Sequence, residues 1–226
     1  MLIGVAGMVG TGKTTLAHAL AARFGLQIAL ESVDADNPWL ESFYGGPDEM
    51  RAYAMHLQLH FLATRFASMR RMRGLGGSWI LDRTWYEDAE IFARGLFEQR
   101  LMSSEEWTLY RRLYAELLHS PAARPPRLLL YLHGPLDTIV DRIATRGRPK
   151  ERETPVEYWR LLHERYDRWI GQFRHCPVLA LDVRTYDLVA DPSTVEDIAG
   201  RVRQQLDGEL PQTELWPAVS RHRAFA

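Results

Sequence analysis

The sequence predicts an α/β fold in which a five-stranded, mostly parallel sheet is covered by helices on both faces. Short apolar stretches of strand length alternate along the chain with longer segments of helical periodicity. Few polar residues interrupt these stretches, which is typical of parallel strands that are buried on both faces. No repeat or long linker divides the chain, so we expect one domain over residues 1–207 and an irregular tail over 208–226.

The expected elements alternate in a regular order. The predicted strands are residues 2–6, 26–30, 79–81, 128–132 and 178–181. The predicted helices are residues 13–24, 47–73, 85–98, 104–119, 136–145, 155–174 and a last one that opens at 191–192. Gly25 lies where the glycine that ends a helix belongs, and Ser103 with Glu106 has the spacing of a capping box.

Composition excludes several classes of protein. The net charge of −1 gives no general electrostatic attraction to nucleic acid or to an anionic membrane, so we expect neither as a partner. The apolar runs are too short to span a bilayer, and the N-terminus lacks the features of a signal peptide. Cys176 is the only cysteine, which excludes an intrachain disulfide. We therefore expect a cytoplasmic protein.

A glycine-rich segment between the first strand and the first helix predicts phosphate binding. Residues 7–14, Gly-Met-Val-Gly-Thr-Gly-Lys-Thr, match the pattern G-x-x-x-x-G-K-[ST] in the required position. The backbone amides of such a loop surround phosphate oxygens, and the helix N-terminus adds positive charge. Lys13 is expected to reach the outer phosphates of ATP, and Thr14 to bind Mg²⁺. The expected ATP-binding residues here are Gly7, Met8, Val9, Gly10, Thr11, Gly12, Lys13, Thr14 and Thr15.

Lysine usage supports this interpretation. Lysine occurs only at positions 13 and 150, and every other basic residue apart from histidine is arginine. An ammonium group acts as a compact point charge, which a planar guanidinium replaces poorly at this position. The same count excludes a GTPase, because the Asn/Thr-Lys-x-Asp guanine motif needs a lysine that the chain does not have.

Three acidic residues follow predicted strands. Glu31 comes after the second strand, Asp82 ends the third, and Asp182 follows the fifth. In open α/β sheets the reacting groups gather at the carboxyl ends of the strands. These carboxylates are therefore candidates for a catalytic base or a metal ligand beside the phosphate loop.

Several ordered motifs resemble the deoxynucleoside kinase family, and in particular its bacterial deoxyadenosine/deoxyguanosine kinases. Besides the phosphate loop they are ESVDADNPWLESFY, LQLHFLATR, DRTWYED, RIATRGRPKE with TPVEYWRLLHERYDRW, and YDLVADP. The resemblance covers residues 1 to about 206 and implies a P-loop kinase with an arginine-rich lid at about 146–154. It also implies a homodimer.

The resemblance implies a role for each matched residue. Glu31 would be the general base that accepts the proton of the substrate 5′-hydroxyl, and Arg83 would bind the same oxygen. Asp82 would hold Mg²⁺, directly or through water. The sugar 3′-hydroxyl would be bound by Tyr44 and Glu151.

Further matched residues would bind the base and the phosphates. Gln58, Arg65 and Asp88 would recognise the base of the nucleoside. Arg142, Arg146 and Arg148 would bind the transferring phosphoryl group, whose distributed negative charge calls for several guanidinium groups. Asp187 and Leu188 would lie in the loop around the adenine of ATP.

Gln58, Arg65 and Asp88 also indicate which nucleosides are suitable. An amide offers a donor and an acceptor, and Asp88 can accept from an exocyclic amine. Thymine has no such amine, so these residues argue against a thymidine kinase but leave adenine, guanine and cytosine open. The resemblance favours a purine, deoxyadenosine or deoxyguanosine, for salvage by ATP-dependent 5′-phosphorylation.

Two other functions remain open at this point. A nucleoside monophosphate kinase would use the same phosphate loop but would need no base, because its acceptor is already a phosphate. A nucleotide-dependent regulatory or nucleic-acid-acting P-loop protein would hydrolyse ATP in response to a macromolecule rather than to a nucleoside.

Overall fold

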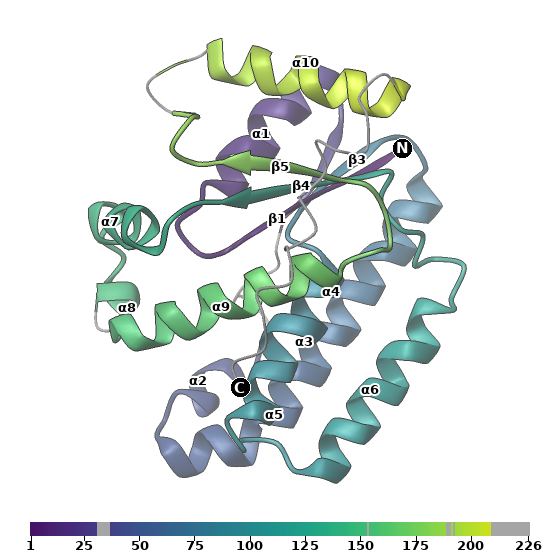
Figure 1. Ribbon diagram of the computed structural model, residues 1–226. Helices are drawn as coiled ribbons and strands as arrows, with labels where there is room; N and C mark the ends of the chain where they lie inside the picture. Colours follow the sequence, from purple (N-terminus) through teal and green to yellow (C-terminus); the bar gives the residue numbers. More distant parts are fainter. Residues whose placement is uncertain (31–36, 153, 189–190, 192, 209–226) are drawn as a thin grey trace, which may run out of the picture.

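The structure, a computed structural model, describes residues 1–30, 37–152, 154–188, 191 and 193–208. Its centre is a parallel sheet with the strand order β2-β3-β1-β4-β5 (Figure 1). The strands are β1 (Leu2–Gly7), β2 (Gln27–Ala29), β3 (Trp79–Asp82), β4 (Leu128–His133) and β5 (Val178–Asp182). All four neighbouring pairs are parallel, which confirms the predicted sheet.

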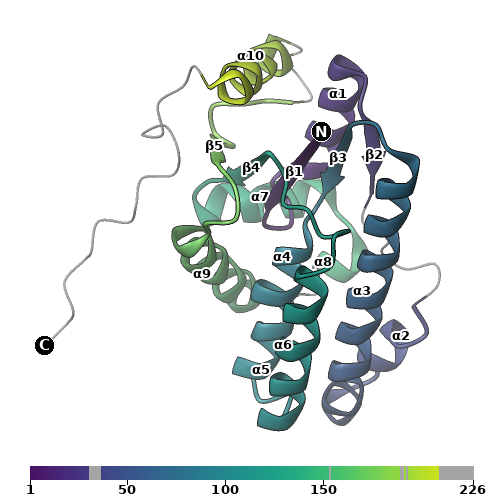
Figure 2. The ribbon, with the colours of Figure 1, turned by 90° about the vertical axis from the view of Figure 1, so that its right-hand side faces the viewer.

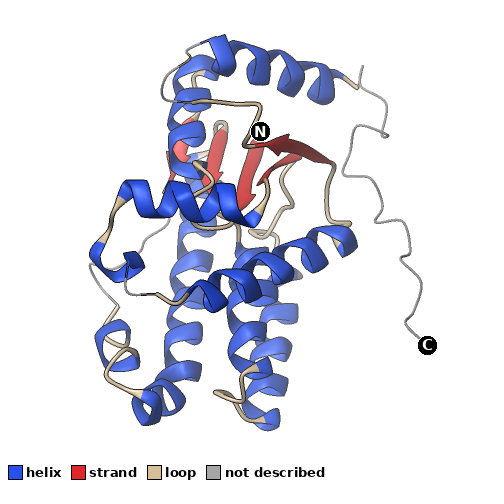
Figure 3. Ribbon diagram, turned by 60° about the vertical axis from the view of Figure 1, so that its left-hand side comes forward, coloured by secondary structure: helices blue, strands red, loops and turns tan. Residues whose placement is uncertain are grey.

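Helices connect the strands and cover the sheet (Figure 3). They are α1 (Lys13–Phe24), α2 (Leu40–Phe43), α3 (Pro47–Leu75), α4 (Trp85–Glu87), the π-helix η1 (Asp88–Ala93), α5 (Arg94–Glu98), α6 (Ser104–Leu118), α7 (Leu136–Arg146), α8 (Pro149–Arg152), α9 (Val156–Gln172) and α10 (Ser193–Asp207). None of the described helices is both long enough and apolar enough to cross a membrane.

The two faces of the sheet carry different sets of helices. Helices α1 and α10 pack together over one face, above the sheet in Figure 1, whereas α9 and α4 lie over the other. The long helices α3 and α6 lie side by side and extend well beyond the sheet (Figure 2). Helix α3 also packs against η1. Because η1 begins six residues after β3 ends, the contact between α3 and η1 lies near the carboxyl end of β3.

The core follows from the apolar strands. Ile3 and Val5 of β1, and residues 128–130 of β4, are fully buried. Because both faces of these central strands are covered, each successive side chain must be apolar, which explains why the strands read as continuous apolar runs. Burial of each large side chain contributes about 1.5–3 kcal/mol.

Two predicted helix-end signals are confirmed. Gly25 has a left-handed conformation (φ 65°), and its N–H donates to the carbonyl of Ala21 at the end of α1. At the start of α6, Glu106 N–H donates to Ser103 Oγ (3.2 Å), and Ser103 N–H donates to the Glu106 carboxylate (2.7 Å). These reciprocal bonds satisfy backbone donors that have no partner within the helix.

The structure differs from the predicted elements in three places. Residues 85–98 were predicted as one regular helix, but the middle of this segment is a π-helix, η1. Such wider turns are rare and often lie at functional sites, and apolar periodicity does not reveal them. The short helices α2 and α8 were not predicted either. Helix α8 lies inside the segment that was expected to form the lid.

Candidate active site

The phosphate loop joins β1 to α1 and depends on its glycines. Gly7, Gly10 and Gly12 have φ values of 148°, 85° and 91°, which side chains with a Cβ rarely adopt. A Cβ on Gly7 would lie 2.5 Å from the carbonyl oxygen of Leu132, and one on Gly10 would lie 2.6 Å from Cγ1 of Ile143. The loop can therefore take its path around a phosphate only with glycine at these positions.

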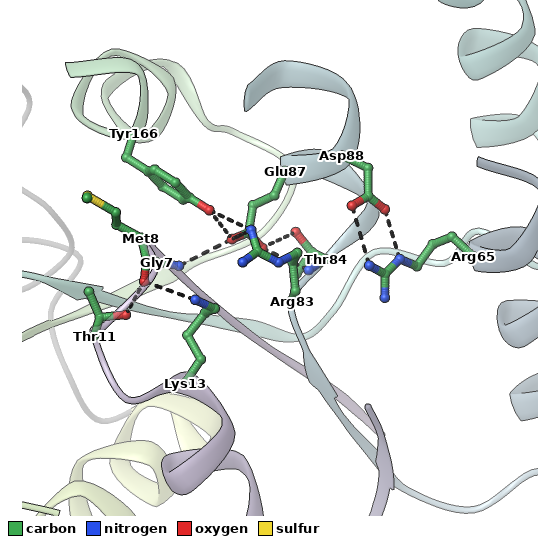
Figure 4. Close-up of polar contacts among 10 residues, drawn as sticks. All are labelled: Gly7, Met8, Thr11, Lys13, Arg65, Arg83, Thr84, Glu87, Asp88 and Tyr166. Atoms are coloured by element: carbon green, nitrogen blue, oxygen red, sulfur yellow. Dashed lines mark hydrogen bonds and ion pairs between the residues drawn. The ribbon is translucent and has the colours of Figure 1, made fainter. Parts of the chain in front are cut away.

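Two side chains of the loop bind its own backbone. The Lys13 ammonium donates to the carbonyl of Met8 (3.0 Å), and the Thr11 hydroxyl donates to the same oxygen (2.8 Å; Figure 4). Lys13 is only 8% exposed. Its charge is therefore held inside the loop, where phosphate oxygens bind in proteins of this kind.

The start of α1 meets the end of β3, because β1 and β3 are neighbouring strands. The Thr14 hydroxyl donates to Asp82 Oδ2 (2.6 Å). Asp82 is 5% exposed, and its Oδ1 has no hydrogen-bond partner among the described residues. A buried carboxylate oxygen without a partner, next to a hydroxyl, suits Mg²⁺, which is commonly held by one or two protein oxygens together with substrate phosphates and water.

Arg83 and Glu87 follow β3 and form a buried polar network (Figure 4). Arg83 is 5% exposed and Glu87 is fully buried. The Arg83 Nη1 donates to the hydroxyl of Tyr166 (2.9 Å), and that hydroxyl donates to Glu87 Oε1 (2.9 Å). Burial raises the pKa of the Glu87 carboxyl, and the charges of Arg83 and Lys13 oppose this rise.

The three residues predicted to recognise the base lie on two facing elements, α3 and η1. Arg65 Nε donates to Asp88 Oδ2 (2.8 Å), and Arg65 Nη2 donates to Asp88 Oδ1 (3.4 Å). Gln58 stands seven residues before Arg65, two helical turns away on the same face of α3. Its side-chain carbonyl is buried, with no hydrogen-bond partner among the described residues. An arginine–carboxylate pair and a buried amide oxygen without a hydrogen-bond partner therefore lie along one face of α3.

The residues predicted to form the lid lie at the end of α7, in the turn after it and on α8. Arg146 Nη2 donates to Glu151 Oε1 (2.5 Å), and Arg148 Nη1 lies 3.8 Å from the same oxygen. Arg146 and Arg148 are exposed. Arg142 instead donates from Nη2 to the backbone carbonyl of Val183 (2.6 Å). The structure thus brings Arg146, Arg148 and Glu151 together, while Arg142 binds the loop after β5.

A small apolar hollow lies beside the phosphate loop, between it and the segment after β5. Its lining includes Thr11 and Leu188. A Cβ on Gly12 would lie 3.3 Å from the Leu188 side chain, so this leucine lies directly over the loop. The predicted adenine-binding segment, Asp187 and Leu188, is therefore next to the phosphate loop, as its expected role requires.

The contacts above include neither Tyr44 nor Glu31. Tyr44 follows α2 and is 61% exposed, with its ring packed edge-on against Phe43. Glu31, the predicted base, lies outside the described residues. Of the three strand-end acids, Asp182 forms an ion pair with Arg184 (2.6 Å).

The sequence analysis missed Glu87 and Tyr166. A signal for Glu87 was present, since Thr84 and Glu87 have the spacing of a capping box at the start of α4. Such a glutamate is usually exposed at a helix end, however, and its burial depends on the packing of α9 against η1. Nothing in the local sequence connects Tyr166 to a residue 79 positions earlier.

The fold and the site define a class of protein. The sheet is parallel, with a phosphate loop after its central strand and a carboxylate at the end of the neighbouring strand. With arginines at the end of the helix after β4, this is the arrangement of P-loop kinases. Residues 3–207 match the family model for deoxynucleoside kinases, and the chain belongs to this family. It is therefore a kinase, and the predicted fold and family are confirmed.

Relatives of known name agree with this assignment. The chain is 40% identical over 201 residues to a deoxyadenosine/deoxycytidine kinase of Bacillus subtilis, covering 89% of this chain and 91% of the relative. It is 33% identical over 219 residues to a deoxyguanosine kinase of Lactobacillus acidophilus, covering 93% of each. A solved structure of deoxyadenosine kinase from M. mycoides with bound dCTP has the same fold, with a TM-score of 0.74 at 24% identity over 90% of this chain and all of that one.

Proposed function

We propose that this kinase transfers the γ-phosphate of ATP to the 5′-hydroxyl of a deoxynucleoside that carries an exocyclic amine, with deoxyadenosine preferred and deoxycytidine second. The observation that carries the proposal is the buried Arg65–Asp88 pair, with the buried and unpartnered carbonyl of Gln58 two turns away on the same face of α3. The relative from Bacillus subtilis, named a deoxyadenosine/deoxycytidine kinase, supports it.

The chemistry of the base edges explains this order. Adenine and cytosine each carry an exocyclic amine donor, whereas guanine carries a carbonyl acceptor at the corresponding position. The carbonyl of Gln58 and the carboxylate of Asp88 both accept hydrogen bonds, so each suits an amine. Guanine offers no donor to Asp88 at that position, and its carbonyl would have to accept from Arg65 or from the Gln58 amide instead. Thymine has no exocyclic amine and adds a methyl group.

Residues at the carboxyl ends of the strands carry the proposed reaction. Glu31 accepts the proton of the 5′-hydroxyl, and Arg83 stabilises the oxygen as it attacks the γ-phosphate. Arg142, Arg146 and Arg148 stabilise the negative charge that spreads over the transferring group. The sugar 3′-hydroxyl is held by Tyr44 and Glu151. The proposal for Glu151 requires its bond to Arg146 to open or be shared when nucleoside binds.

The phosphate donor occupies the loop in this scheme. The backbone amides of residues 7–12 and the Lys13 ammonium hold its phosphates, while Asp187 and Leu188 contact its adenine. Thr14 and Asp82 hold Mg²⁺, which neutralises phosphate charge when it is bound.

A panel of acceptors tests the proposal. ATP consumption and product formation are measured with the four deoxynucleosides and their four monophosphates, each at several concentrations. We expect kcat/KM to rank deoxyadenosine, deoxycytidine, deoxyguanosine and thymidine in that order, with no turnover of monophosphates. Preferred turnover of monophosphates would support a monophosphate kinase. Hydrolysis that responds to a nucleic acid and ignores nucleosides would support a regulatory P-loop protein.

We also propose a homodimer in which the long helices α3 and α6 contact their counterparts. Leu109 and Leu113 on α6 are 50% and 39% exposed, one turn apart on the same face. Light scattering after size-exclusion chromatography tests this proposal, and replacement of both leucines by glutamate is expected to give monomers. A wild-type monomer at micromolar concentration would contradict it.

A further inference from the structure

The Glu87 carboxylate joins three parts of the active site that are far apart in the chain. Its Oε2 accepts from the Thr84 N–H (2.8 Å) and the Thr84 hydroxyl (3.1 Å). Its Oε1 accepts from the Gly7 N–H (3.3 Å) and the Tyr166 hydroxyl (2.9 Å). Gly7 is the first residue of the phosphate loop, Thr84 follows Arg83, and Tyr166 belongs to α9. One buried side chain therefore connects β1, β3 and α9.

Every one of these four bonds is donated to the carboxylate. An ionised carboxylate accepts in all directions, whereas a neutral amide of the same size would turn one of its two ends into a donor. That donor would face either the two Thr84 donors or the Gly7 N–H and the Tyr166 hydroxyl. The arrangement is therefore specific for a carboxylate at position 87, and glutamine cannot reproduce it.

Arg83 is held in an unusual conformation next to this carboxylate. Its φ of 76° is uncommon for a residue with a side chain, and such conformations persist where the surrounding structure enforces them. The Arg83 N–H donates to the carbonyl of Val5. Its guanidinium donates to the Tyr166 hydroxyl, lies 3.7 Å from Glu87 Oε1 and stacks 4.8 Å from the centre of the Phe92 ring.

We propose that Glu87 and Tyr166 are positioning residues for phosphoryl transfer: the carboxylate fixes the start of the phosphate loop relative to the Arg83 segment, and the tyrosine hydroxyl orients the guanidinium. This inference rests on the proposed role of Arg83 at the reacting oxygen. Phosphoryl transfer depends almost entirely on positioning and charge stabilisation, so a displacement of about 1 Å between acceptor and donor sites can cost about 100-fold in rate.

The hydroxyl of Tyr166 offers the cleanest test. Tyr166→Phe keeps the buried ring and removes only the oxygen that joins Arg83 to Glu87. We expect kcat for the preferred deoxynucleoside to fall about 10-fold, while KM for nucleoside and for ATP changes by less than about 3-fold. Tyr110→Phe is the matched control, because Tyr110 is fully buried and its hydroxyl has no hydrogen-bond partner among the described residues. It is expected to leave kcat unchanged.

A double-mutant cycle separates positioning from a general effect on the fold. In an Arg83→Met background the guanidinium is absent, so the Tyr166→Phe change is expected to have almost no further effect on kcat. An equal 10-fold loss in both backgrounds would overturn the proposal, as would a wild-type kcat for the single variant. Circular dichroism and thermal unfolding first establish that the Glu87→Gln variant is folded. Its kcat is then expected to be about 100-fold lower than that of the wild type. A kcat within about 3-fold of wild type would also overturn the proposal.

The same experiment tells a failure of this inference from a failure of the proposed function. If Arg83→Met retains full turnover of deoxynucleosides, the catalytic role of Arg83 is wrong, and the positioning proposal falls with it. If Arg83→Met is inactive while Tyr166→Phe behaves like wild type, the proposed function stands and only the positioning role of Tyr166 is wrong.

Discussion

We expect the ion pair between Arg65 and Asp88 to contribute both to the free energy of unfolding and to the selection of the nucleoside. The two side chains are 12% and 6% exposed and share two hydrogen bonds, at 2.8 and 3.4 Å. Removing one partner of a buried pair leaves the other charge without compensation. We expect Asp88→Ala or Arg65→Met alone to lower the free energy of unfolding by about 3 kcal/mol.

The double variant should behave differently. Removing both charges leaves no uncompensated charge, so the combined loss should be clearly smaller than the sum of the single losses, with an interaction energy of about 2 kcal/mol. Urea unfolding followed by circular dichroism measures all four proteins. Additive losses within about 0.5 kcal/mol would show that the pair is not energetically coupled.

Substrate selectivity gives the second readout. The double variant loses the acceptor for the exocyclic amine and gains room for a methyl group. We expect kcat/KM for deoxyadenosine to fall about 10- to 100-fold, because a hydrogen bond to a charged group is lost. The ratio of thymidine to deoxyadenosine turnover should rise. If this ratio stays at its wild-type value, Arg65 and Asp88 do not recognise the base.

Three further predictions concern other parts of the molecule. Gly10→Ala should destabilise the protein by about 1–3 kcal/mol and weaken ATP binding, because the residue has a φ of 85° and its new Cβ would lie 2.6 Å from Ile143 Cγ1. Thr14→Val should raise the Mg²⁺ concentration for half-maximal rate about 10-fold, since the hydroxyl beside Asp82 is lost. Burial lowers the pKa of His133 below 6.5. The contribution of His133 to the free energy of unfolding should therefore be complete above pH 6.5 and decrease as the pH falls below it.

Matched substitutions serve as controls for these predictions. Gly200→Ala introduces a Cβ that meets nothing within 4 Å on helix α10, so it should be neutral or stabilising. His133→Asn should flatten the acid branch of the stability curve. Normal ATP affinity in Gly10→Ala would contradict the argument for the loop glycine, and a normal Mg²⁺ dependence in Thr14→Val would contradict the proposed metal site. If the stability of His133→Asn falls with acid as steeply as that of the wild type, the argument for His133 is wrong.

The sequence predicted the sheet and the phosphate loop because both depend on local patterns. Buried parallel strands must be apolar throughout, and the loop needs glycine where φ is positive, so each leaves a direct trace in the residues. The loop motif assigned Thr14 to Mg²⁺ and the family resemblance assigned Asp82 to it, and the structure brings the Thr14 hydroxyl to Asp82 Oδ2. The facing positions of Arg65 and Asp88 followed from the family resemblance rather than from spacing.

Other features depend on contacts between distant segments, which local patterns do not contain. The π-helix η1 arises within a continuous helical segment whose apolar spacing looks regular. Glu87 reads as an ordinary capping residue, and only the packing of α9 buries it and brings Tyr166 to it. The bond between Arg146 and Glu151 likewise depends on the turn into α8. The contacts of these residues are therefore set by the packing of distant segments, which the local sequence does not show.

The general base is the centre of the proposed mechanism, and Glu31→Gln tests it most directly. The change keeps the size of the side chain but removes its ability to accept the proton of the 5′-hydroxyl. We predict that kcat with deoxyadenosine falls about 10²- to 10⁴-fold while the dissociation constant for ATP stays within about 3-fold of wild type. A variant that binds ATP normally and still phosphorylates deoxyadenosine at the wild-type rate would contradict the mechanism.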